Sequence, residues 1–411
     1  MTSPALTRPQ ITAWRNAVFV TFALSGLAVA TWMSRVPAVR DQLGVSTTTL
    51  GFVLFGIAVG SMVGLTISSH AIAHVGTART VLLALGIGVL GLPLAAVGSA
   101  LGSPFLVFLG LTVFGFGNGM CDVAMNVAGA ANERALGRTI MPLFHALFSG
   151  GTVLGVGIGA LAEAWKVPIL VHVSIITVVV LAATAVAVRF YQHEEHDVPE
   201  SAASDAPRGW RSRLSAWLEP RTLLIGLIVL GMAFAEGSAN DWLPLAMVDG
   251  HGLDNAAGAV VLAVFLAAMT TGRVAGSWVL DRFGRVPVLR GSAVLAAIGL
   301  AFLIFGPSPA LAVVGAVFWG LGASLGFPVG MSAAADDPAR AAARVSAVAT
   351  IGYVAFLAGP PLIGFLADQI GLLWALSVVL VLVALAGVAS SAAREPRPAL
   401  RGEPRVPSRR G

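Results

Sequence analysis

The chain has 411 residues, of which 57% are hydrophobic and 11% are charged. A soluble domain carries about 25% charged residues, so this composition excludes a soluble globular protein and indicates a chain that lives in lipid. The net charge of +5 does not indicate nucleic acid as a partner, because the arginines stand between apolar runs. The single cysteine, Cys121, excludes an internal disulfide.

Twelve apolar runs are long enough to cross a bilayer as helices, which takes about 20 residues each. The first run follows Arg8 and Arg15 as a signal peptide would, but similar runs follow it and no clear cleavage site appears, so we interpret it as a span. Many runs are rich in glycine and alanine, which allows close helix packing in lipid. We expect an all-α integral membrane protein with spans at 13–36, 46–68, 79–101, 105–131, 139–163, 167–189, 222–246, 255–279, 287–306, 309–335, 344–368 and 371–393.

The distribution of positive charge predicts the orientation of these spans. If the N-terminus is cytoplasmic, most of the arginines fall on the cytoplasmic side, and the opposite side receives only Arg35, Arg40 and Lys166. Cytoplasmic loops carry the excess of positive charge in membrane proteins. The sequence therefore predicts a multi-pass protein of the cytoplasmic membrane with both termini in the cytoplasm.

The longest hydrophilic break, 191–221, divides the twelve runs into two sets of six. It ends in RGWRSRLSAWLEP, where tryptophan and leucine recur at helical intervals among arginines. This piece is either an amphipathic helix on the membrane surface or a plain connecting helix. We expect a six-helix bundle over 1–192, a cytoplasmic linker over 193–220, a second bundle over 221–393 and a disordered cytoplasmic tail over 394–411.

The two sets of six show traces of an internal repeat. A shift of 205 residues places FGFGNGMCDVAMN over WGLGASLGFPVGM and GIGALAE over LIGFLAD without a gap. A shift of 207 places Pro37 over Pro244. Together with the count of six and six, this predicts two pseudo-symmetric six-helix bundles, and transporters of this construction bind substrate near the midplane between them.

The stretch GSWVLDRFGR at 276–285 resembles the signature GxxxxDRxGR of the major facilitator superfamily, in the loop between spans eight and nine. A simple positively charged cytoplasmic turn is the alternative interpretation. The resemblance implies a latch, a set of charged contacts at the cytoplasmic face, made by Gly276, Asp281, Arg282, Gly284 and Arg285. The first-half counterpart, SSHAIAHVGTAR, has Ala73 and Thr77 where the signature has Asp and Arg, so we expect a weaker or different latch there.

Two further stretches resemble a narrower group. GNGMCDVAMN and TTGRVAGSWVLDRF are similar to the fourth and eighth spans of the fucose:proton symporter family. WMSRVPAVRDQLG and the block from GNGMCDVAMN through ALGRTIMPLFHALFS resemble a bacterial branch that includes rhizopine-type transporters. The resemblance implies the major facilitator fold in a bacterial inner membrane and proton-coupled symport of a sugar, polyol or inositol-like solute by alternating access. One departure is span one, ATWMSRVP, which lacks the acid of the family's sugar symporters.

Asp122 is the only charged residue between Thr80 and Asn132. An ionisable residue within a span is costly and is a functional candidate by default. We expect Asp122 to carry the coupled proton, with Asn126 on the same helical face to bind substrate and His145 of span five at a similar depth to share the proton. The alternatives are a structural Asp122 that hydrogen-bonds between helices and a His145 that only packs.

Span seven supplies a second carboxylate, Glu236, near the midplane, with Asn240 on its face as a candidate substrate ligand. Glu236 is either a second proton site or the partner of Arg273, a buried arginine that needs a counter-ion in lipid. Three tryptophans fall in spans that line the cavity of this superfamily, where an aromatic face suits a sugar ring. They are Trp32, Trp242 and Trp319, for which packing or anchoring at the interface is the alternative.

Other functional classes have little support in the sequence. No HExxH or Walker pattern occurs, so we expect no enzyme, cofactor or metal. A receptor or channel is disfavoured by the duplicated halves and the 276–285 signature. Proton-driven efflux of a drug or metabolite is the main rival, although span five reads GGTVLGVGIG, without the Gly-Pro motif of many exporters. We expect a monomer whose partners are a small solute, protons and membrane lipids.

Overall fold

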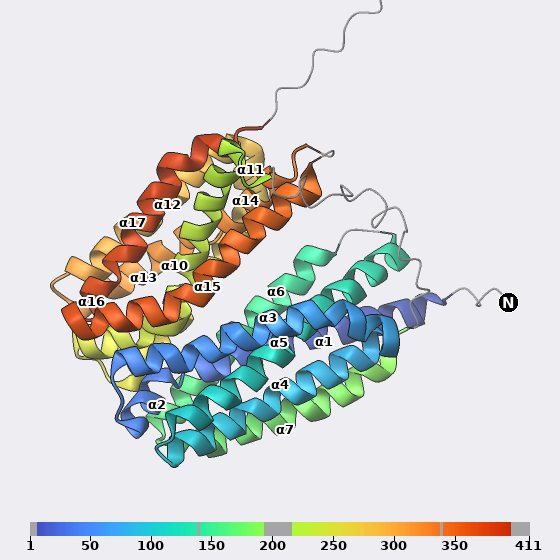
Figure 1. Cartoon of the computed structure of the whole chain (residues 1–411). Coiled ribbons are helices and arrows are strands. Elements are labelled where there is room, and N and C mark those ends of the chain that lie inside the picture. The colour runs from blue at the N-terminus through green and yellow to red at the C-terminus, as the bar shows by residue number, and fades with distance from the viewer. Residues whose placement is uncertain (1–5, 138–139, 193–215, 338–339, 396–411) are drawn as a thin grey trace, which may run out of the picture.

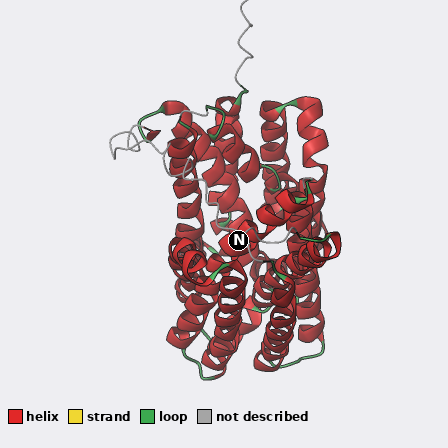
Figure 2. Ribbon diagram, turned by 90° about the vertical axis from the view of Figure 1, so that its right-hand side faces the viewer, coloured by secondary structure: helices red, strands yellow, loops and turns green. Residues whose placement is uncertain are grey.

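The computed structural model describes residues 6–137, 140–192, 216–337 and 340–395 (Figure 1). Within them the regular structure is helical and contains no strands (Figure 2). Twelve helical segments are long and apolar enough to cross a membrane, which confirms the expected number of spans. The expected linker and tail lie mostly outside the described residues, so the amphipathic helix in the linker stays a prediction.

The first six spans form one bundle. It consists of α1 (Arg8–Met33), α2 (Val36–Leu43), α3 (Thr47–Val75), α4 (Thr77–Ala100), α5 (Pro104–Leu136), α6 (Met141–Ala164), α7 (Ile169–Ala187) and the short η1 (Val188–Phe190). The first span is longer than the apolar run, because α2 continues past Pro37 and carries charged side chains at the end of the bundle. We call these helices the N-bundle.

The last six spans form the C-bundle. It consists of α10 (Pro220–His251), α11 (Asn255–Phe283), α12 (Arg285–Phe305), α13 (Pro309–Ala323), α14 (Gly326–Ala334), α15 (Ala341–Ile370), α16 (Leu372–Ala375), α17 (Ser377–Ala389) and η2 (Ser390–Ala393). The tenth span is broken between α13 and α14, and α14 ends before the residues that lead into α15. The C-bundle therefore repeats the six-span plan of the N-bundle.

Local sequence signals set where these helices begin and end. Ser46, Ser103 and Ser308 each accept a backbone N–H of the first helical turn, which is the usual role of an N-cap. Proline stands in the first turn of α5 and α13, where its missing N–H costs nothing. The spans are thus separated by tight, well-capped turns, which keeps successive helices antiparallel.

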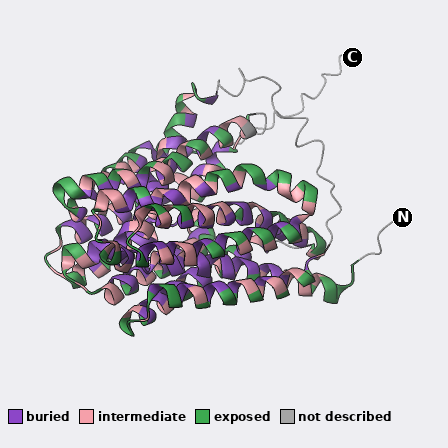
Figure 3. Ribbon diagram, turned by 60° about the horizontal axis from the view of Figure 1, so that its bottom comes forward, coloured by how far each residue is buried: buried purple, intermediate pink, exposed green. Residues whose placement is uncertain are grey.

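Burial follows the lipid solvent rather than water. Each bundle has buried residues between its helices and exposed apolar residues on its outside (Figure 3). Phe105 and Val388, for example, are 71% and 79% exposed. Large apolar side chains on the outside would cause a soluble protein to aggregate, whereas in a membrane they contact acyl chains.

The two bundles meet at one end and diverge toward the other (Figure 1). The contacting pairs are α3 with α15, α6 with α11, and α2 with α10. The described residues nearest the two chain termini lie at the diverging end (Figure 1). They share one end because the number of spans is even. We call the meeting end the closed end and the diverging end the terminal end.

Candidate functional site

Asp122 lies in the middle of α5. At 1.5 Å per residue it is about 27 Å from the start of the helix and about 21 Å from its end. The side chain is exposed and makes no ion pair among the described residues. Its polar neighbour is Asn126, whose Nδ2 donates to the Asp122 backbone oxygen at 2.8 Å and to the carboxylate at 3.4 Å. The carboxylate is therefore nearly free at membrane depth.

The carboxylate of Asp122 has a polar neighbour in the C-bundle. It lies within electrostatic range of the phenol of Tyr353, which is in the middle of α15. Tyr353 is 40% exposed. Because a residue of each bundle contributes, these two polar groups face the region between the bundles rather than lipid.

The second intramembrane carboxylate has a counter-ion. Arg273 of α11 donates to both oxygens of Glu236 of α10, at 2.9 and 2.8 Å. The Arg273 Nε also donates to the backbone oxygen of Ser324, at 3.4 Å. The Glu236 and Arg273 side chains are 19% and 34% exposed. The ion pair that the sequence offered as one alternative is therefore present, and the charge of Glu236 is balanced in this conformation.

No hydrogen bond or ion pair joins His145 to Asp122 among the described residues, although the sequence predicted that the two share a proton. The His145 ring packs edge-on against Phe22, with centroids 5.3 Å apart, and it lies within electrostatic range of Arg273. The reason is helix length. Helix α5 runs on to Leu136, so Asp122 is deeper than the apolar run suggests, whereas His145 is only about 6 Å from the start of α6. His145 therefore belongs to the surroundings of the Glu236–Arg273 pair.

Unpaired polar atoms occur on α10 near this pair. The side-chain oxygens of Ser238 and Asn240 are buried and have no hydrogen-bond partner among the described residues. A buried polar atom without a partner costs about 1–3 kcal/mol. Both residues lie on the helix that also carries Glu236.

The three predicted tryptophans are not open to the region between the bundles in this structure. Trp32, Trp242 and Trp319 are at most 1% exposed and belong to the buried core. The ring of Trp319 packs edge-on against Phe265, with centroids 5.4 Å apart. The packing role that the sequence left as an alternative therefore describes this conformation. Their indole N–H groups have no acceptor among the described residues.

The signature loop differs in part from the expected latch. As expected, Gly276 permits close packing, since a Cβ there would collide with the Leu325 side chain, and Gly284 has a positive φ of 75° where α11 ends. Asp281 and Arg282 are exposed, however, and make no ion pair within the described ranges.

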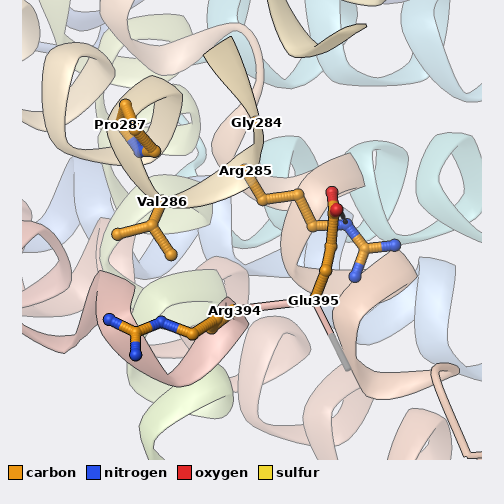
Figure 4. A pocket seen from close by; sticks show the side chains of 6 residues that line it. All are labelled: Gly284, Arg285, Val286, Pro287, Arg394 and Glu395. Atoms are coloured by element: carbon orange, nitrogen blue, oxygen red, sulfur yellow. Dashed lines mark ion pairs between the residues drawn. The ribbon is translucent and has the colours of Figure 1, made fainter. Parts of the chain in front are cut away.

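The paired member of the signature is Arg285. It binds Asp336 at 2.7 Å, and Asp336 also binds Arg221 at 2.8 Å. Arg285 further lies 3.7 Å from Glu395, beside a pocket of about 350 Å³ that Arg394 also lines (Figure 4). The sequence analysis missed Asp336, which lies just after α14 and is 7% exposed. No local sequence signal distinguishes it, because acids are common at the ends of spans.

Comparison with known proteins places this architecture. The family profile described as Major Facilitator Superfamily matches residues 18–281 and 242–410. An uncharacterised MFS-type transporter of Yersinia pestis is 34% identical over 379 residues, which cover 90% of this chain and 93% of the relative.

Two solved structures show the similarity of fold. A bacterial homologue of the human lysosomal transporter Spinster, inward-facing and unoccupied, superposes with a TM-score of 0.73 at 13% identity, over 96% of this chain and all of that one. The transporter FucP in the outward conformation superposes with a TM-score of 0.61 at 15% identity, over 93% of this chain and 99% of its own. At these identities the similarity concerns the fold alone.

Proposed function

The chain belongs to the Major Facilitator Superfamily, and we propose that it carries a small polyhydroxylated solute across the bacterial inner membrane by proton-coupled symport. The transport cycle is alternating access, in which the region between the bundles opens first to one side and then to the other. On the positive-inside argument the terminal end faces the cytoplasm. The structure then corresponds to the state that is open to the cytoplasm and closed to the outside.

The observation that carries this proposal is the contrast between two intramembrane acids. Glu236 is held by Arg273 through two hydrogen bonds, whereas Asp122 has only the weak contact with Asn126. Protonation of Asp122 breaks no ion pair among the described residues, whereas protonation of Glu236 would leave Arg273 without its counter-ion. Asp122 is therefore the proposed proton site, whereas Glu236 and Arg273 are proposed to stay paired throughout the transport cycle.

Polar groups on α5 and α10 suit a solute that carries hydroxyl groups. Asn126, Ser238 and Asn240 offer amide and hydroxyl groups that can each donate and accept. Once Asp122 is protonated, the remaining charges form a balanced pair, so a neutral solute fits better than an ion. FucP is itself a fucose:proton symporter, which agrees with a sugar, polyol or inositol-like solute. His145 is proposed to take part in proton coupling through its proximity to Arg273.

The tryptophans have a more limited role in this proposal. Because Trp32, Trp242 and Trp319 are buried in the present conformation, they contact the solute only after the bundles rearrange. Their unpaired indole N–H groups would then be available to hydroxyl oxygens.

Proton-driven efflux is the competing function. The same carboxylate would serve either function, because symport and antiport differ in whether the protonated carrier reorients with or without bound solute. The amide of Asn126 beside Asp122 and the polar side chains of α10 favour a sugar-like solute over a bulky amphiphilic drug.

Counterflow in proteoliposomes tests the function directly. Purified protein is reconstituted with an unlabelled sugar, polyol or inositol inside, and entry of the same labelled compound is followed. We expect counterflow with at least one compound of this panel, and accumulation of that compound when the outside is made acidic. Absence of counterflow with the whole panel, together with acid-driven export of an amphiphilic dye, would assign the protein to efflux.

A further inference from the structure

At the closed end, a carboxylate of the C-bundle binds the N-terminus of a helix of the N-bundle. Asp368, near the end of α15, accepts the backbone N–H of Thr47 and that of Thr48, each at 3.0 Å, and also the Thr47 hydroxyl. Thr47 and Thr48 are the first two residues of α3. These N–H groups have no partner within their own helix, and the helix dipole places positive charge there.

Two glycines allow the backbones to come close enough for this contact. A Cβ on Gly51 of α3 would collide with the carbonyl oxygen of Pro360, and a Cβ on Gly364 of α15 would collide with that of Thr47. The Thr47 hydroxyl also donates to the Gly364 carbonyl at 3.1 Å. Helices α3 and α15 therefore pack closely at this end, and Asp368 lies four residues after Gly364 on α15.

The internal repeat supplies a counterpart on the other side of the closed end. The shift of 205 residues that aligns GIGALAE with LIGFLAD places Glu163 over Asp368. Glu163, near the end of α6, accepts from the side chain of Asn255, the first residue of α11, at 3.5 Å. Both carboxylates thus lie at the start of a helix of the opposite bundle.

The contact of Glu163 with α11 is weaker than that of Asp368 with α3. Glu163 is already paired with Arg35, at 3.0 Å, and the start of α11 is capped by its own Asp254, which accepts the Ala257 N–H at 2.7 Å. At the start of α3, the helix's own cap Ser46 takes the N–H of Thr49 at 3.3 Å and leaves the first two to Asp368. An ion pair between Arg40 and Asp249 also joins the bundles at this end.

We propose that Asp368 is the principal gate residue of the closed end, and that its release from the first turn of α3 accompanies opening to that side. The energetic basis is that a carboxylate on backbone N–H groups makes charge-assisted hydrogen bonds, which are about twice as strong as neutral ones. Opening exchanges these bonds for bonds to water. Glu163 is the pseudo-symmetric counterpart of Asp368, and its contact with the opposite bundle is the weaker of the two. This inference rests on the proposed alternating access but not on the identity of the solute or of the proton site.

A distance measurement between spin labels tests the gate without any solute. Labels are placed on Leu101→Cys and Ala310→Cys, both exposed near the closed end, in a Cys121→Ala background. We expect one dominant short distance in the parent protein. Asp368→Asn removes the charge and should raise the ratio of long to short distances about tenfold, which corresponds to ~1.4 kcal/mol.

The matched control is Asp254→Asn, because Asp254 caps its own helix and does not bridge the bundles. It should leave the distances unchanged, since Asn is an equally good N-cap. Thr47→Val keeps the backbone N–H groups but loses one donor, so it should shift the ratio in the same direction by less. Unchanged distances in both Asp368→Asn and Thr47→Val, or an equal shift in Asp254→Asn, would overturn the gate. Since no solute or proton gradient is used, that failure would leave the assignment of Asp122 as it stands.

Discussion

Breaking the Glu236–Arg273 pair should destabilise the C-bundle by an amount set by its partial exposure. Removing one member of a fully buried ion pair costs about 3–5 kcal/mol, whereas a surface pair contributes about 0–1 kcal/mol. With side chains 19% and 34% exposed, the pair lies between these limits. We therefore expect Glu236→Gln to lower the free energy of unfolding by about 1–3 kcal/mol.

A double-mutant cycle separates the pair from its surroundings. Glu236→Gln, Arg273→Met and the double variant are unfolded reversibly in mixed micelles of a mild detergent and a denaturing one. Because each single variant leaves the other member unpaired, the double variant should be more stable than the sum of the two single losses predicts. The expected coupling is about 1–2 kcal/mol, within the range found for groups in direct contact.

The control for this cycle is Arg340→Gln. Arg340 also binds a carboxylate of the C-bundle, that of Glu219 at 2.7 Å, but its side chain is 62% exposed. Its loss should therefore cost less than about 1 kcal/mol. If the coupling between Glu236 and Arg273 is no larger than the effect of Arg340→Gln, the ion pair does not hold Glu236 permanently, and Glu236 becomes a candidate proton site.

Three further predictions concern the closed end, the latch and the topology. Gly364→Ala should lengthen the Leu101–Ala310 label distance, because the added Cβ collides with the α3 backbone; an unchanged distance would show that the α3–α15 contact does not set the state. Asp336→Asn should lower the free energy of unfolding by about 1–3 kcal/mol, since it leaves two arginines without their shared partner; denaturant titration checks this, and a loss below the Arg340→Gln value would contradict it. With both termini in the cytoplasm, an impermeant thiol reagent applied to intact cells should label Leu101→Cys but not Ala135→Cys, and the reverse pattern would invert the orientation.

The sequence predicted the architecture because the signal for a span is strong and local. Apolar runs of about 20 residues, the break at 191–221 and the repeat together gave twelve spans in two bundles, and the structure and the family confirm this. The depth of side chains was less predictable. Helix α5 continues past the apolar run through Asn132 to Leu136, because a helix does not end where its hydrophobicity does.

Contacts between distant segments were the least predictable. Arg273 was expected to need a counter-ion, and pairing with it was one of the two roles that the sequence left open for Glu236. Asp336 and Asp368 gave no local signal, since each is an acid at the end of a span, where acids are common. The repeat could have indicated Asp368, because it aligns with Glu163. Burial of the tryptophans depends on which conformation the bundles adopt, and a sequence encodes both conformations.

The central claim is that Asp122 carries the coupled proton, and uptake by Asp122→Asn tests it most directly. The amide mimics the protonated carboxyl and keeps a hydrogen-bonding group at the contact with Asn126. In proteoliposomes supplied with the solute that counterflow identifies, the variant should retain exchange at near the parental rate. It should fail to accumulate solute when the outside is made acidic, whereas Glu236→Gln should still accumulate it. Full acid-driven accumulation by Asp122→Asn would contradict the account.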